Sequence, residues 1–480
     1  MNRRRSAVEL IELVLDPGSF ESWDETIDRS SYSPAYGREV HAATERAGTD
    51  ESVLTGCGSV GGRRVAVVVS EFRFLAGSIG RGTARRIVAA VRRATAEGLP
   101  LLATTASGGT RMQEGTPAFV EMIAITRAVM AHRAAGLPYL VHLRNPTTGG
   151  VYASWGSLGH LTVAQPGALV GFLGPKVFQA LNGAAFPSGV QTAENLAAKG
   201  VIDAVIHDDD LRALVDRALA VVVDAPAVPT LPRRAGPLRR DRSAWSAILE
   251  TRRPGRVGVR DLLRHGGFDT IRLSGTSEGE RDDSVLLALT RLDGQPCVVV
   301  GQDGSRQSPQ TPLGPAALRA ARRAMRLAEE LRLPLVTVID TPGAELSPRA
   351  EESAMAGEIA RCIAELATMT VPTVSVILGQ GCGGGALALL AAQTVIATEN
   401  AWLAPLPPEG ASVIVHADTL HAVEMAEAQQ VRAQDLRTAG VVHRLVPEIP
   451  GESAEALARA VVAEIATSLA GRPACYLPAS

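Results

Sequence analysis

Two glycine-rich stretches have the residue types of a main-chain oxyanion site. Gly149 and Gly150 follow the apolar run 137–143, and Gly384 and Gly385 follow the apolar run 373–378. In both places the order buried strand, glycine turn and small residues predicts a strand that turns directly into a helix. The first amides of a helix have no acceptor within it, and glycine lets a ligand come close. Such amides would stabilise a carbonyl oxygen that becomes negative.

Few side chains near these glycines could act as a base or a nucleophile. His142 and His160 lie in apolar stretches, so we expect both in the core. Cys382 is expected to be a small buried residue of the turn rather than a nucleophile. The only lysines, Lys176 and Lys199, stand in neither a Gly-Lys-Ser/Thr nor a Met-Lys-Met setting. This excludes a P-loop and a biotin attached to this chain.

The two glycine stretches belong to an internal repeat in which every matched pair of positions has the same separation along the chain. This repeat offset carries Gly149-Gly150 onto Gly383-Gly384, Leu99-Pro100 onto Leu333-Pro334, Pro138 onto Pro372, Ser107-Gly108-Gly109 onto Thr341-Pro342-Gly343, and Ala168 onto Trp402. One offset shared over about 70 residues predicts a duplication of whole domains rather than a solenoid.

Each copy reads as alternating strands and helices. We expect strands at 64–70, 99–104, 137–143, 158–164, 285–290, 296–301, 335–340, 373–378, 395–398, 401–404 and 441–446, with a hairpin at Asp293-Gly294. Helices are expected at 84–97, 117–135, 316–331 and 354–368. This pattern predicts an α/β fold with ligands gathered at the glycine turns.

The sequence divides into an extension, two domains and a linker, and its composition argues against some classes of function. We expect an extension at 1–52, domains at 53–223 and 244–480, and a Pro- and Arg-rich linker at 224–243. The linker arginines favour a solvated tether over a phosphate site. A net charge of −2 argues against nucleic-acid binding, and no apolar run could cross a membrane. Residues 1–15 predict an amphipathic helix rather than a signal peptide. The five cysteines are scattered, which predicts a reduced cytoplasmic protein without zinc or disulfides.

Longer motifs carry a family resemblance over most of residues 55–450. Residues 107–115, 145–154 and 165–175 resemble the carboxyltransferase β subunit of bacterial acetyl-CoA carboxylase. Residues 339–344, 379–389, 399–402 and 408–412 look like its α subunit. The chain therefore resembles the fused β–α carboxyltransferase of actinobacteria, whose halves both have the crotonase (ClpP/crotonase) fold. This agrees with the duplication counted from the residues.

The resemblance implies a role for each glycine loop. Gly149 and Gly150 would hold the acyl-CoA thioester carbonyl, and Gly384 and Gly385 the ureido oxygen of carboxybiotin. Further substrate-side residues would be Ser107, Gly108, Gly109, Gly171 and Gly174, and further biotin-side residues Gly343, Gly383, Ala386, Glu409 and Gly410. Arg111 is open between an ion pair with Glu114 and contact with a CoA phosphate.

The family also implies the reaction and the partners. Carboxybiotin, borne by a separate carrier protein, would release CO2, and the biotin itself would take the α-proton of the acyl group, which explains the missing base. Malonyl-CoA for fatty acid biosynthesis would be the product, with a biotin carboxylase, a carrier protein and further copies of this chain as partners. The four-cysteine zinc ribbon of separate β subunits is absent, and residues 345–348 depart from the usual α-type loop.

Several functions remain open on the sequence. One is carboxylation of propionyl-CoA or a longer acyl-CoA in place of acetyl-CoA. Another is an acyl-CoA decarboxylase or hydrolase that uses only the first repeat. A third is a scaffold without catalysis that holds a biotin carboxylase and a carrier together.

Overall fold

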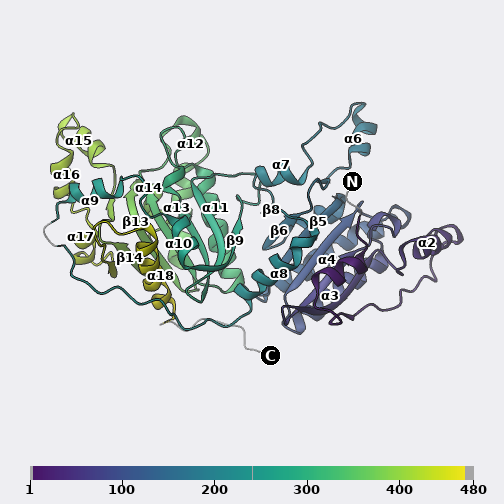
Figure 1. Cartoon of the computed structure of the whole chain (residues 1–480). Helices are drawn as coiled ribbons and strands as arrows, with labels where there is room; N and C mark the ends of the chain where they lie inside the picture. Colours follow the sequence, from purple (N-terminus) through teal and green to yellow (C-terminus); the bar gives the residue numbers. More distant parts are fainter. Residues whose placement is uncertain (1–3, 240–241, 471–480) are drawn as a thin grey trace. The chain divides into compact units, whose positions relative to one another are not determined.

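The computed structural model describes residues 4–239 and 242–470, and it divides into two compact units between Val223 and Asp224 (Figure 1). The extension 1–52 belongs to the first unit, because its strand β1 (Glu21–Ser22) pairs with β2 (Val53–Val60). The residues predicted as a linker belong to the second unit. None of the helices within the described ranges is long and apolar enough to span a membrane.

The first unit is built on a mixed sheet in the order β1-β2-β3-β4-β5-β6-β8, with β7 beside the end of β5. Its further strands are β3 (Arg63–Ser70), β4 (Leu101–Ser107), β5 (Tyr139–Thr148), β6 (Leu161–Ala164), β7 (Val170–Gly171) and β8 (Ala204–Val205). The hairpin β2–β3 is antiparallel, and β3 to β6 run parallel. Parallel strands with buried valine and leucine runs need helices on both faces, which this unit has.

Helices cover both faces of this sheet. They are α1 (Ala7–Val14), α2 (Pro34–Ala47), α3 (Arg81–Ala96), α4 (Gly115–Ala134), α5 (Gly149–Tyr152), α6 (Pro175–Asn182), α7 (Ala193–Ala198) and α8 (Asp208–Val222). The core between α3, α4 and the sheet contains Ala103, Val141 and Leu143, and α1 packs with α8. The predicted amphipathic N-terminal helix is α1, whose start is capped reciprocally by Ser6 and Glu9.

The second unit repeats this plan in the order β9-β10-β11-β12-β13-β14-β16, with β15 beside β13. Its strands are β9 (Gly267–Leu273), β10 (Val285–Leu292), β11 (Gln295–Gln302), β12 (Leu335–Thr341), β13 (Thr373–Cys382), β14 (Thr394–Thr398), β15 (Trp402–Ala404) and β16 (Arg444–Val446). The register shift between Thr105 and Ser107 recurs between Ile339 and Thr341, at the repeat offset. The duplication therefore extends to a local irregularity of the backbone.

The helices of the second unit follow the same arrangement. They are α9 (Ala244–Thr251), α10 (Val259–Gly266), α11 (Pro315–Leu331), α12 (Pro348–Glu352), α13 (Met355–Thr368), α14 (Gly383–Leu387), α15 (Pro408–His416), α16 (Ala422–Ala428), α17 (Ala433–Thr438) and α18 (Ala454–Ala470). Helices α10 and α18 pack together over an apolar sheet face that includes Val338, Val376 and Leu378.

Most predicted elements are confirmed, including the hairpin at Asp293-Gly294, which joins β10 to β11. The prediction missed β2 and β9 as whole strands and ended β5 and β13 too early. In β2, the four small residues at 56–59 interrupt the alternation of larger apolar side chains. The last residues of β5 and β13 include proline, threonine or glycine, which are typical of loops in a sequence.

Candidate functional site

The first glycine site lies where β4 and β5 end side by side. Ser107 pairs in parallel register with Thr147, and β5 passes directly into α5 at Gly149. The two loops touch, because a Cβ placed on Gly149 would lie 3.3 Å from the Cα of Gly109. Gly149 and Gly109 both have positive φ, 64° and 108°, so side chains would be strained as well as crowded there. The structure thus brings the predicted residues Ser107, Gly108, Gly109, Gly149 and Gly150 together.

Not every amide of this site is available to a ligand. The N–H of Gly149 donates to the carbonyl of Phe172 (3.0 Å), and the N–H of Gly108 donates to Ala76 (2.9 Å). The N–H of Gly109 donates to Ser107 Oγ (3.0 Å). Gly150, the second residue of α5, has no intrahelical acceptor for its amide. The sequence analysis gave Gly149 and Gly150 equal roles, and the hydrogen bond to Phe172 corrects this in favour of Gly150.

Met122 and Thr110 border Gly150 and were missed by the sequence analysis. A Cβ on Gly150 would lie 3.4 Å from Thr110 Oγ1 and 3.5 Å from Met122 Cγ. Gly150 itself is only half-buried. Met122 lies on α4, one of a series of apolar residues at helical spacing, and nothing in that pattern distinguishes it from the core.

The second glycine site is built in the same way at the ends of β12 and β13. Gly383 begins α14 with φ 65°, close to the 64° of Gly149, and Gly343 has φ 141°. The N–H of Gly343 donates to Thr341 Oγ1 (3.1 Å), as that of Gly109 does to Ser107. A Cβ on Gly385 would lie 3.5 Å from the Cβ of Ala344. Ala386 is fully buried behind these glycines.

Gln302 fixes the second site and was not found from the sequence. Its side-chain amide donates to the carbonyl of Gly385 (2.6 Å) and its oxygen accepts from the N–H of Asp340 (3.1 Å). The side chain is 1% exposed, so both bonds are made in a dry environment. Gln302 therefore ties the start of α14 to the end of β12.

Asp340 stands near the end of β12 beside the same site and is a half-buried residue. Its Oδ1 accepts from the N–H of Gln380 (3.1 Å). Burial raises its pKa from the ordinary value of 3.8 to about 7, against the lowering effect of Arg256. An unfolded chain therefore ionises Asp340 near pH 4 while the folded chain keeps the proton up to about pH 7. The contribution of Asp340 to stability is present in full below pH 4 and is lost as the pH rises to 7.

We predict that Asp340→Asn raises the free energy of unfolding at pH 8 by roughly 2 kcal/mol and changes it little at pH 4. The amide has the shape of the carboxyl group and keeps an acceptor for the N–H of Gln380. Denaturant unfolding at the two pH values measures the difference. Equal effects of the substitution at pH 4 and pH 8 would contradict it.

Glu409, predicted on the biotin side, is held by an arginine. Its carboxylate binds Arg252 through both oxygens (2.5 and 3.2 Å), and the Nε of Arg252 donates to Gln380 (3.4 Å). Hydrogen bonding to Arg252 lowers the pKa of Glu409. Glu409 and its neighbour Gly410 lie on α15, and Arg252 connects them to the end of β13.

Two substrate-side predictions lie at the edge of the first site. Gly171 pairs with Thr148 at the end of β5, and a Cβ on it would clash with Gln191 at 2.4 Å. Glycine is therefore needed at position 171 because the side chain of Gln191 occupies the space of a Cβ. Gly174 caps the start of α6, and no atom lies within 4 Å of a Cβ placed on it. No contact brings Gly174 to the glycine loops.

Arg111 is a structural residue, so of the two roles left open by the sequence the structure favours the ion pair over contact with a CoA phosphate. Its side chain is 0% exposed and forms an ion pair with Glu51, while Glu114 lies 3.6 Å away. Its guanidinium also donates to Ser78 and Tyr36. These acceptors surround the group, so none of its donors points to solvent where a CoA phosphate could approach.

The residues predicted to be inert are confirmed as such. His142 is fully buried, and burial lowers its pKa to about 3. His160 is 3% exposed and accepts from the N–H of Tyr139 (3.0 Å). Cys382 is 1% exposed, and burial raises the pKa of its thiol to about 11, so it is not a thiolate at neutral pH. Cys475 lies outside the described residues.

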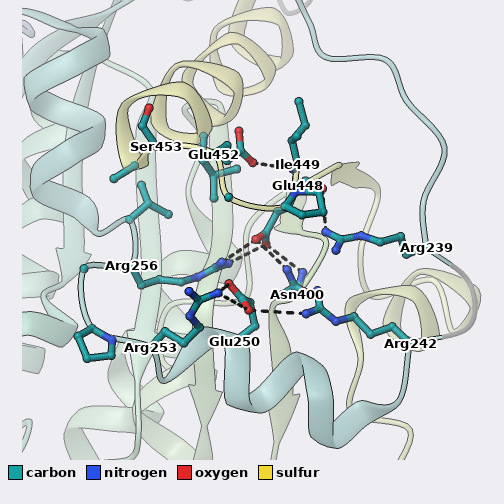
Figure 2. A pocket seen from close by; sticks show the side chains of 17 residues that line it. Arg239, Arg242, Glu250, Arg253, Arg256, Asn400, Glu448, Ile449, Glu452 and Ser453 are labelled. Atoms are coloured by element: carbon teal, nitrogen blue, oxygen red, sulfur yellow. Dashed lines mark hydrogen bonds and ion pairs between the residues drawn. The ribbon is translucent and has the colours of Figure 1, made fainter.

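The arginines of the predicted linker are bound, which corrects the expectation of a solvated tether. Arg233 pairs with Glu464 (2.8 Å) and Arg234 with Glu452 (2.7 Å). Arg239 and Arg242 line a cavity of about 350 Å³ together with Arg253, Arg256, Glu250, Asn400 and Glu448 (Figure 2). Carboxylates pair with the arginines around this cavity, so it lacks the excess positive charge of a phosphate site.

The strongest pair in this cavity joins Arg256 to Glu448 through two contacts of 2.6 and 2.7 Å, with the two side chains 11% and 6% exposed. We predict that Glu448→Gln lowers the free energy of unfolding by about 3–5 kcal/mol, because it leaves the guanidinium of Arg256 buried without its counter-charge. Thermal or denaturant unfolding measures this loss. Glu250→Gln is the control and should cost less than about 1 kcal/mol, because its partner Arg253 is 68% exposed and its other partner, Arg242, lies at 3.6 Å.

Within the described residues no group of three or more His, Cys, Asp or Glu side chains could hold a metal ion. The two sites present main-chain amides at helix starts, once in each unit. Such amides are suited to oxygens that gain negative charge. The class of protein defined by this fold and these loops is a duplicated crotonase-like enzyme.

Comparison with known proteins identifies the family. The carboxyl transferase domain family matches residues 2–461, and the chain belongs to it. The chain is 56% identical over 463 residues to the probable biotin-dependent acyl-coenzyme A carboxylase beta3 subunit of Mycobacterium tuberculosis, covering 95% of this chain and 93% of that protein. It is 36% identical to the acetyl-coenzyme A carboxylase carboxyl transferase subunits beta/alpha of Saccharopolyspora erythraea, covering 93% and 81%.

Solved structures confirm the fold. A structure of transcarboxylase 12S superimposes with a TM-score of 0.79 at 20% identity, covering 99% of this chain and 92% of that one. A single-chain long-chain acyl-CoA carboxylase gives a TM-score of 0.71 over 46% of its length. The chain is thus a member of the carboxyl transferase family, and its two similar domains have the fold of transcarboxylase 12S.

Proposed function

We propose that this chain transfers a carboxyl group from carboxybiotin to the α-carbon of a short acyl-CoA, with acetyl-CoA as substrate and malonyl-CoA as product in fatty acid biosynthesis. The observation that supports this most is the pair of matching glycine loops, one in each unit, each presenting helix-start amides. Two different ligands whose oxygens gain charge need two such sites.

In the first unit, we assign the thioester carbonyl to the amide of Gly150. As the substrate becomes an enolate, negative charge develops on this oxygen, and a hydrogen bond in a dry site is worth about 3–4 kcal/mol. Gly109 and Gly149 hold the two loops in contact and admit the substrate because they lack side chains. Met122 and Thr110 limit the space beside the acyl group.

In the second unit, we assign the ureido oxygen of biotin to the amides of Gly384 and Gly385. The residues fit this group: Gly383 and Gly384 are half-buried, and Leu313, Ala344 and Ile359 line the glycines with apolar atoms. When bound, carboxybiotin supplies the carboxyl group. Gln302 holds the carbonyl of Gly385 and so keeps the start of α14 in place.

The partners in this proposal are a biotin carboxylase, a biotin carrier protein and further copies of this chain, acting together in the cytoplasm. Exposed apolar side chains on α4 support an oligomer, among them Phe119, 60% exposed, and Ile123, 54% exposed. A face of this kind on a helix beside the first site is typical of surfaces that become buried on association.

The direct test supplies carboxylated biotin and an acyl-CoA and follows the formation of the carboxylated product. We expect malonyl-CoA from acetyl-CoA, and the same assay with propionyl- and butyryl-CoA, with isothermal titration of each, ranks the chain lengths. No product with any of the three would overturn the proposal.

The similarity to an acyl-CoA carboxylase subunit supports propionyl-CoA or a longer acyl-CoA as the alternative substrate. A higher kcat/KM with one of these than with acetyl-CoA would establish it. A decarboxylase or hydrolase would consume acyl-CoA without carboxylated biotin, and a scaffold would leave carboxylation unaffected by substitution of Gly150.

A further inference from the structure

Four buried polar residues of the first unit hold atoms that lack a hydrogen-bond partner. Thr104, His142 and Arg144 are at most 2% exposed, and Asp208, the first residue of α8, is 7% exposed. Thr104 Oγ1, both ring nitrogens of His142, Arg144 Nε and Asp208 Oδ1 have no partner among the described residues. These are five of the fifteen such side-chain atoms in the described chain, so the unpaired polar groups are concentrated in one place.

These residues face one another between the sheet and α8. Thr104 and His142 are paired in parallel register on β4 and β5, so their side chains lie on the same face, and Arg144 follows His142 by two residues. The Nε2 of His142 lies 3.7 Å from Asp208 Oδ1. A cavity of about 440 Å³ adjoins Asp208 and is also lined by Arg5, Glu9, Gln165, Pro166, His207 and Asp209. Of the four residues, Asp208 therefore borders this cavity directly, and His142 lies behind it.

The second unit shows that the fold does not require polar residues here. At the repeat offset, Thr104, His142 and Arg144 correspond to Val338, Val376 and Leu378. All three are fully buried in the apolar core under α18. Buried polar groups without partners cost stability, so their presence in one copy alone points to a ligand that satisfies them.

We propose that Thr104, His142, Arg144 and Asp208 form a binding site for small neutral hydrogen-bonding molecules, which are ordered waters in the resting protein. The charged groups that act on Arg144 and Asp208 are three of each sign, so the site selects neither an anion nor a cation; they are Arg4, Arg5 and Arg144 against Glu71, Asp208 and Asp209. Its free groups include both donors and acceptors, which water can satisfy together. A water in such a site makes two to four bonds, and this cluster supplies that many.

The site is linked to the first glycine loop, and this part of the inference rests on the proposed function. Asp208 accepts from Gln165 Nε2 (3.3 Å), and Gln165 Oε1 accepts from the N–H of Asn145 (3.2 Å). Thr147 Oγ1 donates to the carbonyl of Arg144 (2.9 Å). These bonds hold the segment that leads into Gly149 and Gly150. The four residues are therefore positioning residues that fix the loop through ordered water.

The first test is a crystal structure of the full chain at a resolution that shows water. We expect ordered density within hydrogen-bond distance of Asp208 Oδ1 and Arg144 Nε. A dry cavity, with the four side chains as described, would overturn the site whatever the outcome of the carboxylation assay.

The second test uses the double variant Thr104→Val/His142→Val, which introduces the valines found at the matching positions of the second unit. We expect this variant to fold with an unchanged or higher unfolding midpoint, to lose the density, and to lose kcat about tenfold with little change in the KM for acyl-CoA. The reciprocal control, Val338→Thr/Val376→His, should lower the unfolding midpoint, because it places polar groups in the apolar core under α18. An unchanged kcat in the first variant would overturn the link to the glycine loop, and retained density would overturn the binding site.

Discussion

Gly150→Val is expected to lower the kcat of carboxyl transfer by about 100-fold or more while the chain stays folded. The valine methyl groups would meet Thr110 and Met122, which already lie 3.4 and 3.5 Å from a Cβ, and would cover the amide. Gly150 has no positive φ, so the substitution is not expected to strain the backbone. Steady-state carboxylation, with circular dichroism and thermal unfolding as checks on folding, measures the effect.

The matched control is Gly37→Val on α2 of the same unit. No atom lies within 4 Å of a Cβ on Gly37, and its φ is not positive, so the same change of residue is expected to leave activity intact. Gly150→Ala should fall between the two. If the Gly150→Val variant were folded and fully active, the proposed role of the Gly150 amide in the mechanism would be wrong.

Gly384→Val is expected to abolish carboxyl transfer while acyl-CoA still binds. A Cβ on Gly384 would lie 2.6 Å from Cδ1 of Ile359, so a larger side chain must either displace Ile359 or cover the helix-start amide. The proposal places acyl-CoA on the first unit and biotin on the second, so only the biotin side should be damaged. Isothermal titration with acyl-CoA and the reverse carboxylation of free biotin from malonyl-CoA separate the two effects.

Two companion variants identify the cause. Gly384→Ala/Ile359→Ala removes the clash and should recover part of the activity that Gly384→Ala loses. Gly236→Val, on an open position of the second unit, should be silent. If Gly384→Val weakened acyl-CoA binding as strongly as carboxyl transfer, the assignment of one ligand to each unit would be wrong.

Local sequence patterns predicted most of the architecture. Valine-rich runs and glycine punctuation place β3, β12 and β13 because strands buried on both faces are continuous apolar segments. The constant offset between the two copies predicted that they share one topology. The two sheets confirm this, and even a register shift recurs at the matching position. Strand β2 was missed because its pairing with β3 comes from the hairpin rather than from its own residues.

The site was predictable only where glycine carries the information. Gly109, Gly149 and Gly383 could be predicted because a positive φ favours glycine, so the residue type itself indicates the turn. Gln302 and Asp340 do not, because their importance arises from partners far along the chain that only folding brings close. The roles of Arg111 and of the linker arginines likewise depended on acidic partners such as Glu51, 60 residues away in the chain.

The anchored arginines before α9 determine where this polypeptide could be divided. A second half that started at residue 244 would lack Arg233, Arg234 and Arg239. Glu452 and Glu399, at most 10% exposed, would lose these counter-ions, and Glu464 would keep only its 3.8 Å contact with Arg444. A split between Val223 and Asp224 keeps each carboxylate with its arginine. Separate expression of the halves, or a gene in which they are encoded apart, should therefore tolerate a break at that peptide bond but not one just before α9.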